Sequence, residues 1–291
     1  MFVKLKAHSL RRALGKIDTK RDEGLIFPED VRLVEGIAYG GHKMHTLEVN
    51  LPAGAENPPL IINVHGGGYV YGSTLPYRHY CASLARRGFA VVSFNYRLAP
   101  EFKFPTPLED LNAVVGWCLE HSGEYGFSTE NVFMVGDSAG AQLVSHYAAM
   151  VSNREFADIM EIIPPAELKL RAVGLNCGMY DLREVLTHIG SPKDVMECYF
   201  TKKHARFGRK LDVLDFITEN YPPTQLISAP GDFLYHCCEP MWQHLVSRGV
   251  EAECKIYGTE KTHHVFHVNM KNPLSTVAND CQTEFFRRHM K

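Results

Sequence analysis

Short, mostly apolar segments alternate with longer amphipathic segments along much of this chain. The apolar segments lie at residues 60–64, 89–94, 131–135, 170–175, 223–228 and 253–257. They predict strands that are buried on both faces, as in a parallel sheet. Helix-like segments lie between or after them, at residues 80–87, 108–121, 139–151, 239–248 and 275–288. This alternation predicts an α/β fold with a mostly parallel, doubly wound sheet and helices on both of its faces.

Two parts of the chain depart from this alternation. Residues 31–39 and 43–50 alternate apolar and polar side chains around Gly40-Gly41, which predicts a β-hairpin. Residues 180–222 contain helical pieces, aromatic side chains and several charges. Ligand sites in such sheets lie at the carboxyl edge, which favours a small helical cap here over an ordinary crossover with extra helices. Together with the polar residues 1–30, whose helix-like part spans 9–16, this cap would complete one domain over residues 1–291.

The composition is ordinary for a globular protein. Of the 291 residues 45% are hydrophobic and 22% are charged, and the formal net charge is −2. This balance argues against a nucleic-acid surface, and no apolar run is long enough to span a bilayer. No charged and apolar leader opens the chain, so we expect no secretory signal. Acidic residues at 18, 22 and 23 interrupt or follow the basic residues of 4–21, which favours a solvated helix over a mitochondrial presequence.

The eight cysteines are scattered along the chain without a C-x-x-C pair. This usage favours reduced thiols, and we therefore expect a cytoplasmic protein. The adjacent Cys237-Cys238 has no further residues at metal-ligand spacing beside it, so no metal site is expected.

The chain is organised around Gly136-Asp137-Ser138-Ala139-Gly140, which joins a predicted strand directly to a predicted helix. So sharp a turn needs small neighbours and places the Ser138 hydroxyl above the sheet, where a base and a substrate can reach it. The N–H of Ala139 would lie at a helix N-terminus, where it can stabilise an oxyanion. The pattern Gly-x-Ser-x-Gly fixes only three positions and can also occur by chance in a turn, so the rest of the chain decides between these interpretations.

A second glycine-rich loop follows the buried strand at 60–64. It reads His65-Gly66-Gly67-Gly68-Tyr69. The three glycines leave the backbone bare, so that a substrate can approach its N–H groups. A phosphate-binding loop would need a different glycine spacing or a Lys-Ser/Thr ending, and neither is present.

An acid and a base follow the serine in chain order. Asp232 and His264 each come just after a predicted strand, as Ser138 does. The carboxyl ends of parallel strands share one edge, so these three residues are expected to meet there. The imidazole can take the serine proton, and a carboxylate behind it can fix its tautomer. His263 and His267 remain rivals for the base, and Glu239 and Glu260 have poorer positions for the acid.

Three motifs together resemble the hormone-sensitive-lipase-like branch of the α/β-hydrolases. They are residues 65–68 (HGGG), 96–101 (YRLAPE) and 136–140 (GDSAG), and the resemblance runs from about residue 60 to the end. It implies an α/β-hydrolase fold and serine hydrolysis of short-chain carboxylic esters without a cofactor or metal. By this resemblance Ser138 is the nucleophile, Asp232 the acid and His264 the base. The oxyanion donors are then Gly66, Gly67 and Ala139, while Asp137 and Glu101 brace the loops.

The chain departs from the family pattern at two places. The acid motif has His236 where a second Asp is usual, and the base motif has Val265 where a glycine is usual. His264 is preferred as the base because Phe266 follows it by two residues, as in the family motif.

Other functions share these residues. An amide hydrolase, such as an arylformamidase or a peptidase, would pass through the same oxyanion intermediate, and a non-catalytic binding protein could retain the fold.

The sequence predicts a small-molecule ester as substrate, with neither nucleic acid nor membrane as partner. It leaves open whether the protein is a monomer or a homodimer. Tyr69, Phe200 and Phe233 are expected to line the substrate pocket.

Overall fold

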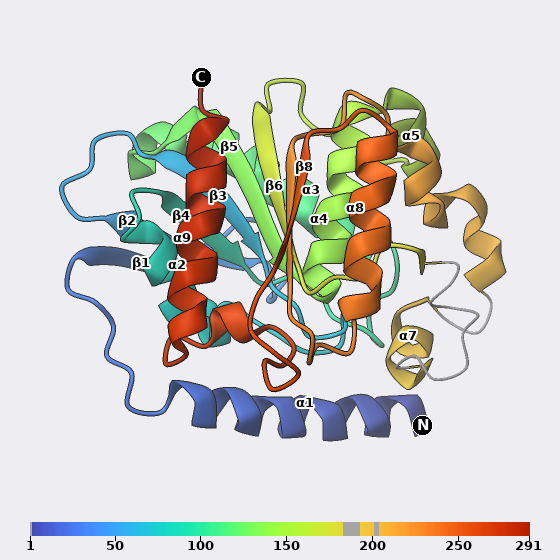
Figure 1. The fold of residues 1–291 in the computed structure, drawn as a ribbon, viewed down its shortest axis with the longest axis horizontal. Helices are drawn as coiled ribbons and strands as arrows, with labels where there is room; N and C mark the ends of the chain where they lie inside the picture. The colour runs from blue at the N-terminus through green and yellow to red at the C-terminus, as the bar shows by residue number, and fades with distance from the viewer. Residues whose placement is uncertain (1, 183–192, 201–203) are drawn as a thin grey trace.

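The computed structural model describes residues 2–182, 193–200 and 204–291 (Figure 1). Its centre is an eight-stranded sheet with the order β1-β2-β4-β3-β5-β6-β7-β8. The strands are β1 (Val31–Ala38), β2 (Thr46–Pro52), β3 (Pro59–Val64), β4 (Ala90–Phe94), β5 (Ser128–Asp137), β6 (Leu170–Asn176), β7 (Thr224–Ser228) and β8 (Ala252–Ile256). The strands from β4 to β8 in this order pair in parallel, and β2 pairs antiparallel with β1 and β4. The predicted hairpin and mostly parallel sheet are both confirmed.

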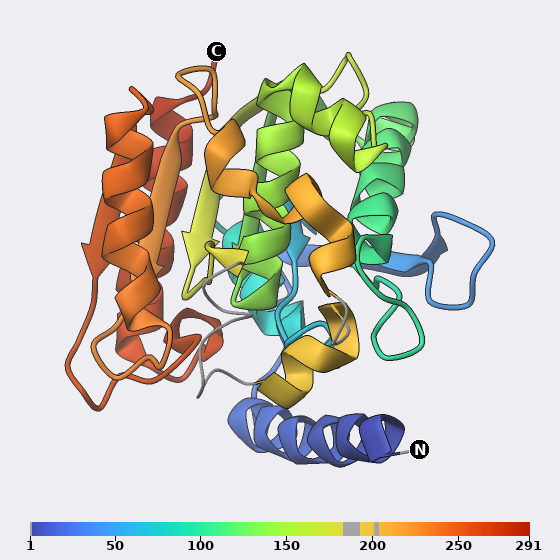
Figure 2. The ribbon, with the colours of Figure 1, turned by 90° about the vertical axis from the view of Figure 1, so that its right-hand side faces the viewer.

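Helices cover both faces of the sheet, as the alternating pattern predicts (Figures 1 and 2). They are α1 (Phe2–Asp22), α2 (Arg78–Ala85), α3 (Thr106–Tyr125), α4 (Ala139–Ser152), α5 (Arg154–Met160), α7 (Lys193–Phe200), α8 (Cys238–Ser247) and α9 (Pro273–Arg288). The short α5 was not predicted. No helix in the described part of the chain combines the length and the apolarity needed to cross a membrane.

Side chains of the central strands alternate between two cores. On β3, Leu60 and Ile62 belong to one hydrophobic cluster with residues of α3 and α4, whereas Ile61 belongs to another with residues of α2 and α9. All three are completely buried. Burial on both faces explains why this segment is continuously apolar in the sequence.

The helix α1 runs across the carboxyl edge of the sheet, beside α7 (Figures 1 and 2). It is much longer than the stretch at 9–16 that the sequence predicts. The predicted cap segment 180–222 falls partly on residues 183–192 and 201–203, which lie outside the described residues. Its described part forms α7 and the 3-10 helices η2 (His204–Leu211) and η3 (Val213–Phe216).

The start of α4 packs directly against the end of β3. A Cβ atom added to Gly140 would lie 1.9 Å from the carbonyl oxygen of Val64, and one added to Gly136 would lie 2.4 Å from the carbonyl oxygen of Gly140. Real Cβ atoms do not approach backbone atoms this closely, so both positions require glycine. The contact holds the loop after β3 beside the turn at Ser138.

Replacing Gly140 with alanine should therefore lower the free energy of unfolding by about 3 kcal/mol or more, since the backbone of β3 must move. Gly116→Ala is the matched control. It lies inside α3 with no atom within 4 Å of its added Cβ, so alanine there should raise the free energy of unfolding by about 0.5–1 kcal/mol. Urea denaturation measures both. Equal effects of the two substitutions would contradict the close packing at Gly140.

Candidate active site

Ser138 occupies the turn between β5 and α4. Its backbone has φ 52° and ψ −118°, a conformation that is strained for a residue with a side chain. Its N–H donates to the carbonyl oxygen of Asn176 at the end of β6, at 2.9 Å. Ser138 lines a pocket that also contains His264. The strand, turn and helix that the sequence predicts around this serine are confirmed.

Asp232 and His264 lie in contact, although 32 positions separate them in the sequence. Nδ1 of His264 is 2.7 Å from Oδ1 of Asp232. The carboxylate also accepts the N–H of Leu234 at 2.9 Å and the hydroxyl of Ser228 at 3.2 Å. Burial by itself would raise the pKa of Asp232, but the hydrogen bond and positive charge offered by His264 outweigh it and hold the pKa below its ordinary value. The carboxylate is thus kept charged and fixed behind the imidazole.

The rival histidines and carboxylates lie elsewhere. His263 is exposed, and its backbone pairs with Gly231. His267 is buried, and neither of its ring nitrogens has a hydrogen-bond partner among the described residues. Glu239 and Glu260 are both exposed. Of these histidines, only His264 forms the hydrogen bond to Asp232 in the described structure.

The loop after β3 carries three glycines with different roles. The N–H of Gly66 donates to the hydroxyl of Tyr77 at 2.9 Å, so this donor is already engaged. In the described structure the N–H groups of Gly67, Gly68 and Ala139 have no hydrogen-bond acceptor. Gly67 and Gly68 line the pocket together with Ser138. Because the N–H of Gly66 already donates to Tyr77, the structure does not support the prediction of Gly66 as an oxyanion donor. Gly68 lines the pocket beside Gly67 and has an N–H without an acceptor in the described structure.

Tyr77 joins this loop to the residue before the serine. Its hydroxyl accepts the N–H of Gly66 and donates to Oδ2 of Asp137 at 2.9 Å. Both Tyr77 and Asp137 are buried. Burial raises the pKa of Asp137 to about 6, against the opposing hydrogen bond from Tyr77. The sequence indicated that Asp137 braces a loop, but nothing in the pattern identified Tyr77 as the connection.

The pocket has a volume of about 240 Å³ within the described residues. Its wall comes from the two glycine-rich turns, the His264 loop, α7 and the inner face of α1. The residues from α1 are Leu10, Leu14, Asp18 and Arg21. Their spacing of four, four and three is that of one helix face. The sequence analysis missed them, although this periodicity was present in the sequence.

Polar contacts tie α1 to the loops around the pocket. Arg11 donates to the carbonyl oxygens of Val70 at 2.7 Å and Ala99 at 2.8 Å, and it pairs with Glu101 at 3.0 Å. Asp18 accepts the hydroxyl of Tyr71 at 2.6 Å. These contacts fix the helix over the pocket and give Glu101 the bracing role predicted for it.

Only one of the three predicted wall residues lines the pocket. Phe233 does so, with its ring centroid 4.3 Å from that of His264. Tyr69 is instead fully buried, stacked on Tyr199 at 3.9 Å and hydrogen-bonded to Gln142. Phe200 is fully buried as well and packs against Phe104. Tyr69 and Phe200 are thus corrected to core residues, because the sequence shows proximity to the motif but not the direction of a side chain.

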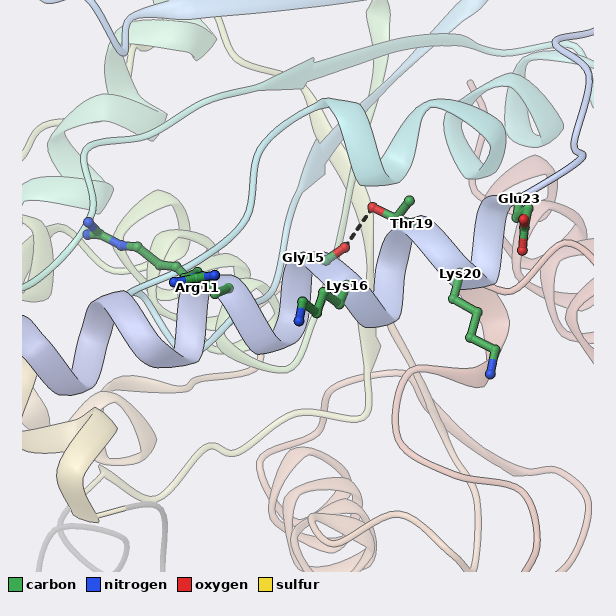
Figure 3. Close-up of a pocket in the computed structure, with 7 residues that line it drawn as sticks. Arg11, Gly15, Lys16, Thr19, Lys20 and Glu23 are labelled. Atoms are coloured by element: carbon green, nitrogen blue, oxygen red, sulfur yellow. Dashed lines mark hydrogen bonds between the residues drawn. The ribbon is translucent and has the colours of Figure 1, made fainter.

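A second hollow, with a volume of about 640 Å³, lies along α1 (Figure 3). It is lined by Arg11, Arg12, Gly15, Lys16, Thr19, Lys20 and Glu23. Figure 3 shows Lys16 and Lys20 projecting from the helix, and the hydroxyl of Thr19 donating to the carbonyl oxygen of Gly15 at 2.8 Å. None of the candidate catalytic residues lines it, so the smaller pocket at Ser138 is the relevant one.

Comparisons with known proteins agree with this architecture. A family profile described as alpha/beta hydrolase fold matches residues 61–268. Esterase B from Lactobacillus Rhamnosis (HN001) has a similar solved structure, with a TM-score of 0.90 and 23% sequence identity over 99% of this chain and 95% of that chain. At this identity the likeness shows the fold alone.

Three curated proteins are similar in sequence. Probable carboxylesterase 7 of Arabidopsis thaliana is 26% identical over 96% of this chain and 92% of its own length. Ethyl acetate hydrolase of Pseudomonas putida is 34% identical over 39% of this chain and 38% of its own length. Hormone-sensitive lipase of Bos taurus is 34% identical over 39% of this chain and 16% of its own length. The chain therefore spans less than half of the latter two proteins, and the resemblance to the hormone-sensitive-lipase-like branch is confirmed.

The buried His267 makes stability depend on pH. Burial lowers the pKa of His267 to about 3, whereas an unfolded histidine titrates near 6.5. Below about pH 6.5 the unfolded state binds a proton that the folded state does not. The stability contribution of neutral His267 is therefore complete above pH 6.5 and declines as the pH falls toward 3.

His267→Gln removes this titration. Between pH 7 and pH 4, the free energy of unfolding of the wild type should fall by on the order of 2–3 kcal/mol more than that of the variant. Urea denaturation of both proteins at several pH values measures it. Parallel pH profiles would show that His267 is not a buried neutral group.

Proposed function

The chain belongs to the α/β-hydrolase fold family, and on that premise we propose that it cleaves short-chain carboxylic esters through a Ser138–His264–Asp232 triad. The observation that carries the proposal is the 2.7 Å contact of His264 with the buried Asp232, in the pocket that Ser138 lines. A serine hydroxyl is a weak nucleophile without a base. The triad supplies that base and orients it.

The reaction proceeds in two acyl-transfer steps. Nδ1–H of His264 donates to Asp232, which leaves Nε2 free to accept the proton of the Ser138 hydroxyl as its oxygen attacks the ester carbonyl. The imidazolium then protonates the departing alcohol, and an acyl-enzyme remains on Ser138. Water activated by the same imidazole releases the carboxylic acid. These steps use the side chains of this chain alone.

The negative charge that develops on the carbonyl oxygen needs fixed donors. We assign this role to the N–H groups of Gly67 and Gly68, which line the pocket, and of Ala139, which follows Ser138 directly. None of these three N–H groups has an acceptor within the described structure. Donors that are already oriented stabilise such a charge without reorganisation. Gly66 does not belong to this set, because its own N–H donates to the hydroxyl of Tyr77.

The size of the pocket favours a short acyl chain. Its volume of about 240 Å³ within the described residues lies below the roughly 300–1,000 Å³ typical of sites for drug-sized ligands. Leu10, Leu14, Met179, Met196 and Phe233 give it an apolar wall. Esters related to the substrate named for ethyl acetate hydrolase are therefore the first to test.

We assign residues 1–30 and 180–222 as a cap on a single domain that spans residues 1–291. The support is that α1 and α7 contact each other and both contribute to the pocket wall. For location we propose the cytoplasm, because none of the eight cysteines forms a disulfide, as expected in a reducing compartment.

Ser138→Ala should lower kcat for p-nitrophenyl acetate by roughly a millionfold, because it removes the nucleophile. The matched control is Ser145→Ala, which removes a buried hydroxyl from the same helix outside the pocket and should change kcat little. Initial rates with acetate to decanoate esters test both variants and should fall with chain length in the wild type. Hydrolysis of N-formylated anilides but not of esters would instead favour the amide-hydrolase function, and substantial activity of Ser138→Ala would refute the triad.

Tyr77→Phe should lower kcat about tenfold with a smaller change in KM, because the loop that carries the oxyanion donors loses its anchor. It leaves the N–H of Gly66 and Oδ2 of Asp137 without this partner. Tyr147→Phe is the control, since it deletes a hydroxyl hydrogen-bonded to Asn112 away from the pocket. Steady-state kinetics separate the two. An equal loss of kcat in both variants would indicate general destabilisation rather than positioning of the loop.

A further inference from the structure

A buried thiol that the proposed mechanism does not use lies behind the triad. Cys177 follows β6, is 1% exposed and has φ 49°. Burial, together with the neighbouring Asp232 carboxylate, raises the pKa of this thiol well above its ordinary value. One ligand atom each from Cys177, Asp232 and His264 lie within 4.8 Å of one another. The sulfur atom of Cys177 thus lies close to both the acid and the base of the proposed triad.

We infer that Cys177, Asp232 and His264 form an inhibitory binding site for a soft divalent cation such as Zn²⁺ or Cd²⁺. The metal site follows from the geometry of the three side chains. Its inhibitory effect rests on the proposed function, because it requires His264 to be the catalytic base.

The donor set fits a soft cation. Sulfur, imidazole nitrogen and one carboxylate oxygen are ligands that Zn²⁺ accepts, whereas Mg²⁺ and Ca²⁺ require oxygen. A thiolate and a carboxylate together neutralise a divalent cation, which a buried site requires. With bonds of roughly 2.0–2.3 Å, the ligand atoms of a tetrahedral zinc lie roughly 3.3–3.8 Å apart, so Nδ1 of His264 and Oδ1 of Asp232 must separate from their present 2.7 Å. Of the three side chains, His264 lines the pocket that Ser138 also lines.

Binding would exchange protons for metal bonds. Nδ1 of His264 holds the proton that it donates to Asp232, and the cation takes its place by accepting the Nδ1 lone pair. The imidazole proton moves to Nε2, the thiol proton of Cys177 goes to solvent, and the sulfur and carboxylate oxygen complete the ligands. His264 then carries its proton on Nε2 and cannot accept one from Ser138. Inhibition should therefore be complete at saturation and reversed by a chelator.

The first test is titration of p-nitrophenyl acetate hydrolysis with ZnCl₂, using full-length protein and expressing each rate relative to the same variant without metal. Wild type should be inhibited, with recovery in EDTA. Cys177→Ser should require at least about tenfold more Zn²⁺ for half-inhibition, because a lost ligand weakens the site at least as much as a lost supporting group. The control Cys238→Ser should behave as wild type. Equal Zn²⁺ sensitivity of Cys177→Ser and wild type would overturn the proposal.

The second test does not depend on turnover and so separates this proposal from the proposed function. Cys238 and Cys254 form another thiol pair, with sulfur atoms 3.4 Å apart, so Cd²⁺ binding is measured in a Cys238→Ser background. The thiolate-to-Cd²⁺ charge-transfer absorbance should saturate at one Cd²⁺ per chain and disappear on adding Cys177→Ser. Asp232→Asn in the same background should weaken Cd²⁺ binding even if the cysteine variant fails to fold. Unchanged absorbance with Cys177→Ser, or no weakening with Asp232→Asn, would overturn the site.

Discussion

The packing of α4 on the end of β3 is the constraint on which the site depends. With a Cβ at Gly140 only 1.9 Å from a carbonyl oxygen of β3, the helix could not start where it does. This contact brings the turn at Ser138 and the loop of Gly67 and Gly68 together, although they belong to different strands. The proposed nucleophile and the proposed oxyanion donors of the glycine loop are therefore held together by one backbone contact in the centre of the sheet.

A second layer of polar contacts holds this arrangement from above. Arg11 and Asp18 of α1 bind the segment that follows the glycine loop. Tyr77, in the 3-10 helix η1 (Leu75–Tyr77), then links Gly66 to Asp137. The helix that covers the pocket is thus connected through a few hydrogen bonds to the backbone beside Ser138.

Sequence reasoning predicted the central sheet and the meeting of Ser138, Asp232 and His264, because strand ends and chemical motifs are local signals. The hydrogen bond between His264 and Asp232 was consistent with that prediction, whereas the catalytic roles remain a proposal. The sequence predicted Gly66 as an oxyanion donor, but in the structure its N–H donates to Tyr77. Motif spacing does not show which N–H groups are already engaged in a hydrogen bond. Tyr69 and Phe200 lie in the core for a similar reason: their side-chain directions depend on contacts with distant elements. The full length of α1 was missed because its polar face obscured the stripe that contains Leu10 and Leu14.

The central claim is that Ser138 attacks the ester carbonyl as His264, oriented by Asp232, takes the proton of the serine hydroxyl. Its most direct measurement is the reaction of the protein with a p-nitrophenyl phosphonate, followed by mass spectrometry of the modified peptides. The account predicts release of one p-nitrophenolate per chain and a single phosphonyl adduct on Ser138, formed far more slowly in a His264→Gln variant. An adduct on another residue, or ester turnover that continues after Ser138 is fully phosphonylated, would contradict it.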